Sequence, residues 1–139
     1  MKKFIRDFID GCLVPAVVVL VLLMGADAVA QSDRLLDAIE QVESGGRTNV
    51  VGDNGKAIGP MQIHRVYWQD AVEHDPSIGG CYAECKDPTY ARRIVRAYMD
   101  RYAPKGASDE VLARIHNGGP KGHRKDATVK YWVKVRRRL

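Results

Sequence analysis

Residues 43–63 read ESGGRTNVVGDNGKAIGPMQI, and this stretch decides how the rest of the chain is interpreted. It begins with Glu43, directly after a helical pattern. Ten residues later an Asp-Asn-Gly turn starts at Asp53, and apolar, partly β-branched residues flank that turn between positions 50 and 58. Such a turn between apolar runs is a hairpin signal. The stretch therefore predicts one carboxylate at a helix end and a second on the turn of a small hairpin.

The helical pattern before it places Glu43 more closely. Apolar residues recur at helix spacing from position 35 to 42, Ser32 or Asp33 can cap the start, and two glycines follow at 45 and 46. In that phase Glu43 lies beside the apolar stripe, whereas Glu40 points further toward solvent. We therefore expect Glu43 to be the acid that sits half in the core.

Two carboxylates in unlike surroundings are what glycoside hydrolysis requires. Desolvation is expected to raise the pKa of Glu43, and Asp53 on a polar turn is expected to stay ionised. This asymmetry assigns the acid to Glu43 and the base or nucleophile to Asp53. By spacing alone an ordinary explanation stays open, in which Glu43 belongs to a helix end and Asp53 only fills a turn.

Most of the remaining chain is predicted to be helical. An apolar pattern follows residue 63 and ends at Asp75-Pro76, and the segment 77–86 is predicted to be a loop. Asp87-Pro88 begins an amphipathic helix that ends before Pro104. Ser108 caps another, and a last helix is expected from about residue 126. Five short helices and one hairpin predict an α+β domain that is predominantly helical.

The first 30 residues have the pattern of an export signal. Basic residues precede an apolar run from Leu13 to Met24, and Ala28-Val29-Ala30 has the form of a cleavage site. A retained membrane anchor is the alternative, but the run is short of the roughly 20 residues of a spanning helix. We expect a signal peptide over 1–30, a catalytic domain over 31–139, a secreted or periplasmic location, and no stable membrane span after cleavage.

Charge and cysteine content narrow the partners. Residues 1–30 hold equal numbers of basic and acidic side chains, so residues 31–139 keep the net charge of +5. That charge suits an anionic cell-wall surface, and no nucleic-acid motif is found. Cys81 and Cys85 are expected to form one disulfide in an oxidising compartment, since no second Cys or His pair stands at zinc spacing. The sequence predicts no metal and no cofactor.

Three blocks taken in order give a family resemblance. They are Glu43-Ser44-Gly45, then residues 59–63 (GPMQI) with Tyr67-Trp68, and finally residues 113–120 (ARIHNGGP) followed by Tyr131-Trp132. Together they resemble the invertebrate-type lysozyme, or destabilase, family over about residues 35–135. The third block is specific, whereas the first two are also similar to lytic transglycosylases and goose-type lysozymes.

The resemblance implies a lysozyme-like fold with a substrate cleft and cleavage of the β-1,4 bond between N-acetylmuramic acid and N-acetylglucosamine in peptidoglycan glycan strands. The family's catalytic Glu falls on Glu43, and its catalytic Asp falls on Asp53, although the loop here is shorter by a couple of residues. The family is usually rich in cysteine, and this chain keeps only Cys81 and Cys85 after residue 30.

Further polar and aromatic residues of these blocks are candidates for binding the sugar chain. They are Gln62, Tyr67, Trp68, His116 and Asn117. The alternative is structural, because tryptophans are commonly core residues and an Asn-Gly-Gly run commonly ends a helix.

Three other functions stay open beside the muramidase. A lytic transglycosylase would use Glu43 alone. An isopeptidase would need an activated nucleophile, and no serine has an evident base in the sequence. A wall-binding module that had lost the chemistry is the alternative without catalysis.

Overall fold

The computed structural model describes residues 33–139. The first helix covers residues 33–43, as predicted, and buries Leu35, Leu36 and Ile39 completely or nearly so. It ends where Gly45 adopts a positive φ of 65°, a left-handed conformation that glycine tolerates best. The predicted signal peptide over 1–30 lies outside the described residues.

A three-stranded antiparallel sheet follows. Its strands are β1 (Val51–Gly52), β2 (Ala57–Ile58) and β3 (Ile63–His64), in the order β1-β2-β3. The hairpin of β1 and β2 confirms the prediction, and the short helix η1 (Asp53–Gly55) forms its turn. The sequence does not predict strand β3. Two residues are too few to show an alternating pattern, and the preceding Gly-Pro pair suggested that the strand had ended.

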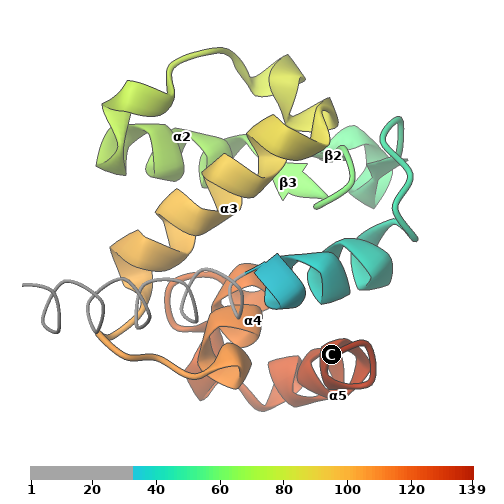
Figure 1. The fold of residues 1–139 in the computed structure, drawn as a ribbon, viewed down its shortest axis with the longest axis vertical. Coiled ribbons are helices and arrows are strands. Elements are labelled where there is room, and N and C mark those ends of the chain that lie inside the picture. Colours follow the sequence, from blue (N-terminus) through green and yellow to red (C-terminus); the bar gives the residue numbers. More distant parts are fainter. Residues whose placement is uncertain (1–32) are drawn as a thin grey trace, which may run out of the picture. The chain divides into compact units, whose positions relative to one another are not determined.

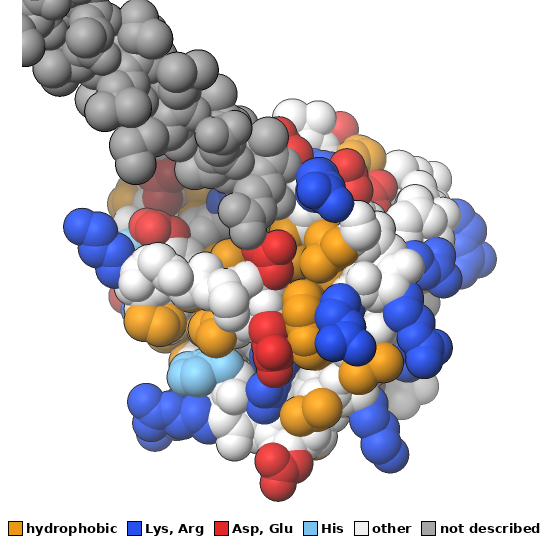
Figure 2. All heavy atoms as spheres, turned by 60° about the horizontal axis from the view of Figure 1, so that its bottom comes forward, with side chains coloured by type: hydrophobic (Ala, Val, Ile, Leu, Met, Phe, Trp, Pro, Cys, Tyr) orange, Lys and Arg blue, Asp and Glu red, His pale blue; other side chains and the backbone are white. Residues whose placement is uncertain are grey.

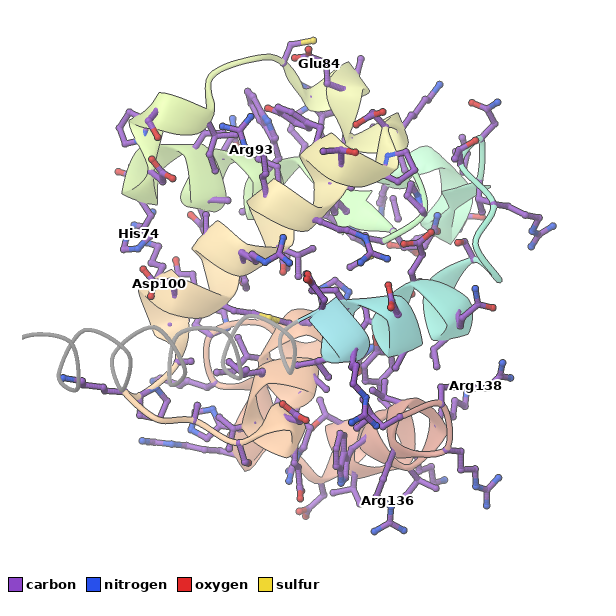
Figure 3. All side chains as sticks on the ribbon, in the orientation of Figure 1. His74, Glu84, Arg93, Asp100, Arg136 and Arg138 are labelled. Carbon is purple, nitrogen blue, oxygen red and sulfur yellow. The ribbon has the colours of Figure 1, made fainter. Side chains whose placement is uncertain are left out.

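Four further helices complete the fold: α2 (Arg65–His74), α3 (Pro88–Tyr102), α4 (Asp109–Gly118) and α5 (Val129–Arg136). Helix α3 packs against both α2 and α4, and Figure 1 shows it running between them. At the far end of α2, His74 Nε2 lies 2.9 Å from Asp100 Oδ2 of α3, and Figure 3 shows these two side chains facing each other. The expected α+β, mainly helical architecture is confirmed.

Helix α3 begins as its sequence predicts. Pro88 occupies its first turn, and the Asp87 carboxylate accepts a hydrogen bond from the backbone N–H of Tyr90 at 2.8 Å. Its buried face includes Ile94 and Val95, which have no exposed surface. The segment before it, expected as a loop, contains two 3-10 helices, η2 (Pro76–Ile78) and η3 (Tyr82–Lys86).

The first helix is tied to α3 by an ion-pair cluster that corrects one expectation. Arg92 Nη2 lies 2.6 Å from Asp37 Oδ1 and 2.7 Å from Glu40 Oε2. The Glu40 side chain is 13% exposed, compared with 19% for Glu43. Glu40 therefore does not point to solvent as its helix phase suggested, because Arg92 covers it from the neighbouring helix.

The junction between α4 and α5 is compact. It contains η4 (Gly122–Arg124) and η5 (Asp126–Thr128), so α5 starts three residues later than expected. A Cβ at Gly122 would collide with the carbonyl group of Arg114 in α4. The buried Thr128 hydroxyl donates to Gly122 O at 2.7 Å and accepts from Arg114 Nε at 2.9 Å. Within residues 33–139 no helix is long and apolar enough to cross a bilayer.

Candidate active site

Glu43 occupies the last position of the first helix, and two donors from distant parts of the chain meet its carboxylate. The Tyr131 hydroxyl of α5 donates to Glu43 Oε1 at 2.7 Å. His116 Nε2 of α4 lies 3.5 Å from the same oxygen. The three residues come from three separate helices, so the tertiary fold creates this arrangement.

His116 is fixed from its other side as well. Its side chain is only 4% exposed, and Nδ1 lies 3.0 Å from the Tyr67 hydroxyl. The Tyr67 ring stacks on Tyr98 of α3 with the ring centroids 3.5 Å apart. Tyr131, Glu43, His116 and Tyr67 thus form a continuous chain of polar contacts, which we call the Glu43 network. Each imidazole nitrogen of His116 has one defined neighbour, so the ring is held in a fixed orientation beside Glu43.

The charge state of Glu43 differs from expectation. Burial raises the pKa of Glu43, as predicted, but hydrogen bonding and charge from His116, the Tyr131 hydrogen bond and the Lys134 charge all lower it. The net result is a pKa below the usual value. The expected rise of the Glu43 pKa is therefore wrong in direction. The sequence pattern shows the apolar stripe beside Glu43 but not the distant donors that stabilise its anion.

The two tyrosines of the Glu43 network stay protonated. Burial raises the pKa of Tyr131 well above its usual value, and the nearby Glu43 anion raises it further. Burial likewise raises the pKa of Tyr67, with smaller contributions from Tyr98 and Glu43. Both hydroxyls therefore remain protonated at neutral pH, and the Tyr131 hydroxyl keeps its hydrogen bond to Glu43.

Asp53 lies in different surroundings. It occupies the turn η1 with a φ of 48°, and Asn54 follows with a φ of 53°; Asp and Asn tolerate this left-handed region better than most residues. The Asp53 side chain is 56% exposed, and its Oδ2 lies 3.4 Å from His64 Nε2 on β3. The predicted contrast between a half-buried Glu43 and a solvated Asp53 is therefore present.

Gln62 and Trp68 have structural roles. Gln62 Nε2 donates to Gly59 O at 2.9 Å and reaches Val50 O at 3.4 Å, so its amide group braces the base of the hairpin. A Cβ at Gly52 would collide with Gln62 Oε1. Trp68 Nε1 donates to the Tyr90 hydroxyl at 2.9 Å, and its ring packs against the core. The contacts of Gln62 and Trp68 are therefore those of residues that support the fold, and neither contact requires a bound sugar chain.

Asn117 differs from its neighbour His116. It is exposed near the end of α4, and no hydrogen bond to its side chain is found among residues 33–139. Of the five residues expected to bind the sugar chain, Asn117 thus keeps an amide group available to a ligand. Tyr67 and His116 are brought to Glu43 instead.

The expected disulfide is absent, because both cysteines are free. Cys81 is exposed at the start of η3, where its sulfur caps the backbone and its N–H donates to Glu84 Oε2 at 2.5 Å. Cys85 is fully buried in the core. Burial raises the pKa of the Cys85 thiol to about 12, so it remains a protonated core residue. In the described part of the chain, no cluster of three or more His, Cys, Asp or Glu side chains could hold a metal ion.

Comparison with known proteins identifies the family of this chain. The family model described as Destabilase matches residues 32–138. A lysozyme of Ostrea edulis is 37% identical over 134 residues, which cover 91% of this chain and 93% of that protein. A lysozyme of Magallana gigas is 36% identical and covers 88% and 91%. The crystal structure of an inhibitor-bound lysozyme from Meretrix lusoria is 34% identical with a TM-score of 0.65, covering 75% of this chain and 87% of that one.

The fold and these matches define a glycoside hydrolase of the lysozyme class. Within that class the chain belongs to the destabilase family, whose members are also called invertebrate-type lysozymes. Tyr131 is the site residue that sequence reasoning missed. Tyr131 belongs to the Tyr-Trp pair that contributes to the family resemblance, but a contact across 88 positions leaves no local pattern.

Proposed function

We propose that the protein is a muramidase that cleaves the β-1,4 bond between N-acetylmuramic acid and N-acetylglucosamine in peptidoglycan. Glu43 acts as general acid and Asp53 as nucleophile or base. The supporting observation is the contrast between the two carboxylates: Glu43 is half-buried and held by donors, whereas Asp53 is exposed on a turn. The predicted export signal over residues 1–30 would place the enzyme outside the cytoplasm.

The lowered pKa of Glu43 sets a condition on this role. A general acid must carry a proton, and the free protein favours the Glu43 anion. A sugar chain that covers Glu43 would exclude water and strengthen the effect of burial, which raises the pKa. Such a rise would work against His116 and Tyr131, which both contact Glu43 Oε1 and favour its anion. We therefore expect activity to be highest on the acidic side of neutrality.

The reaction then balances with one water molecule. Glu43 protonates the glycosidic oxygen of the leaving sugar, and Asp53 either attacks the anomeric carbon or activates water against it. Water finally supplies a hydroxyl group to that carbon and restores the proton lost from the acid. The product is a glycan strand with a new reducing end.

One observation favours a second candidate, a lytic transglycosylase. Asp53 is more than half exposed, and its ionisable neighbour is His64. A reaction that uses Glu43 alone would not depend on so exposed a carboxylate. The isopeptidase receives no such support. The Ser44 hydroxyl donates to Glu40 O, Ser77 to Asp75, and Ser108 caps α4.

Digestion of purified peptidoglycan, followed by mass analysis of the fragments, tests the proposal. We expect reducing muramic acid ends from the wild type and about 10² to 10⁴-fold slower release of them from Glu43→Gln. Anhydro-muramic ends would overturn the muramidase in favour of the transglycosylase. Binding without any release of fragments would indicate a wall-binding module instead.

A further inference from the structure

The charge of this chain is concentrated at its C-terminal end. Residues 121–139 contain eight Lys and Arg residues and one acid, Asp126, whereas residues 1–120 contain 14 basic and 16 acidic residues. The whole excess of positive charge therefore lies in the last 19 residues. The eight residues, which we call the C-terminal basic surface, are Lys121, Arg124, Lys125, Lys130, Lys134, Arg136, Arg137 and Arg138.

All eight side chains belong to exposed residues. Within residues 33–139 none of them forms an ion pair with an Asp or Glu side chain, although Arg92, Arg101 and Arg114 elsewhere each do. Figure 2 turns the α5 end of the molecule forward and shows Lys and Arg side chains spread around that face, with some acidic side chains between them. Figure 3 shows Arg136 and Arg138 pointing outward. Exposed positive charges without acidic partners attract a polyanion.

Helix α5 connects this surface to the Glu43 network. Its buried side carries Tyr131, which donates to Glu43, and Val135, which is in the core. Its exposed side carries Lys130 and Lys134, and the Lys134 charge already lowers the pKa of Glu43. A polymer held on this surface would therefore lie against the helix that supports the candidate acid.

The apolar content of the surface argues against insertion into a bilayer. The apolar side of α5 is used inside the protein, and Val129, 41% exposed, is the large exposed hydrophobic side chain of residues 121–139. An interfacial membrane helix needs a free apolar face in addition to its charge. Electrostatic docking to a hydrated polymer needs only the charge.

We propose that the C-terminal basic surface docks the enzyme on a phosphate-bearing polyanion of the bacterial wall, of the poly(glycerol phosphate) type. The choice of the wall rests on the proposed function, whereas the binding itself does not require cleavage. Docking would keep the enzyme at the wall between cleavage events. It would also weaken with added salt, because bound counterions are released and the charges are screened.

The test measures binding of the full chain to purified poly(glycerol phosphate) at low and at physiological salt, with uncharged dextran as the reference polymer. A triple variant, Arg136→Gln, Arg137→Gln and Arg138→Gln, removes three charges and leaves Lys134 beside Glu43. The matched variant Lys86→Gln, Arg93→Gln and Lys105→Gln removes three exposed charges outside the surface. We expect the first variant to lose on the order of tenfold more affinity than the second.

Each other outcome overturns the inference. Equal losses in the two variants would mean that net charge alone governs binding, and binding to dextran would remove the role of charge. Tighter binding to phosphatidylglycerol vesicles, per phosphate, would identify a membrane surface instead. Thermal midpoints of both variants verify folding. Polymer binding without muramidase activity would reject only the proposed function, and activity without polymer binding would reject only this inference.

Discussion

The two candidate catalytic carboxylates lie ten residues apart in the chain and are held in different ways. Glu43 receives partners from α4 and α5, at a distance of 73 to 88 residues along the sequence. Asp53 lies on a turn made by its own hairpin, and its neighbour His64 belongs to the same small sheet. The chemistry of Glu43 therefore depends on the whole fold, whereas that of Asp53 depends on about a dozen residues.

The largest expected effect comes from removing the acid. Glu43→Gln should lower kcat/KM on peptidoglycan by about 10² to 10⁴-fold, because the leaving oxygen loses its proton donor. Release of reducing ends measures this loss. Glu40→Gln is the matched control, since it changes a similarly buried Glu three residues earlier on the same helix. It should keep kcat/KM and lower the free energy of unfolding by roughly 1 kcal/mol through its weakened contact with Arg92.

Removing the second carboxylate tests whether the exposed turn belongs to the site at all. Asp53→Asn should lower kcat by about 10²-fold or more. The anomeric carbon would lose the group that attacks it or activates water against it. The control is Asp100→Asn, which changes another exposed Asp beside a His, on α3. Unchanged activity of Asp53→Asn would reduce the site to Glu43 and favour the transglycosylase.

The pH dependence of kcat/KM should distinguish the surroundings of Glu43 from those of Asp53. His116 lowers the pKa of Glu43 while burial raises it, so His116→Gln should raise the pKa of the acid. Glu43 would then keep its proton to higher pH, and the fall of kcat/KM with rising pH should move upward. His64→Gln, which alters the neighbour of Asp53, should leave that alkaline fall in place. The measurement is the pH profile of kcat/KM, and coincident alkaline limbs for wild type and His116→Gln would contradict it.

The smallest expected effect is on stability. Because the folded pKa of Glu43 lies below its unfolded value, the anion contributes stability that is present above the unfolded pKa and lost as pH falls through the folded pKa. Urea unfolding of wild type and Glu43→Gln from about pH 6 to pH 3 should show the wild type losing stability relative to the variant. A constant difference across that range would mean that the Glu43 network does not favour the anion.

Local sequence patterns predicted the parts of the fold that are built locally. The first helix, the hairpin and the Asp87-Pro88 start of α3 each depend on residues within a few positions of one another. Strand β3 was not predicted from the sequence, because its two residues form a strand only when paired with β2. Glu40 was misplaced for a similar reason, since its burial is caused by Arg92 of another helix.

The same division holds for the candidate site. Glu43 and Asp53 could be named from their spacing and surroundings, and His116 could be named from its block. The contacts of His116 and Tyr131 with Glu43 could not be predicted from the sequence. The direction in which the pKa of Glu43 shifts depends on those contacts. Apolar residues near Glu43 in the sequence indicate desolvation, which raises its pKa. They do not indicate the donors from α4 and α5, which lower it.

The junction between α4 and α5 determines more than where a helix begins. Gly122 lets the chain pass directly against the carbonyl group of Arg114, and Thr128 fastens the two sides. His116 lies just before this junction and Tyr131 just after it, so the turn acts as a spacer that sets how far apart the two donors stand. A methyl group at Gly122 would force this junction to shift. We expect that shift to move His116 and Tyr131 relative to Glu43 and so to change the pKa of the acid.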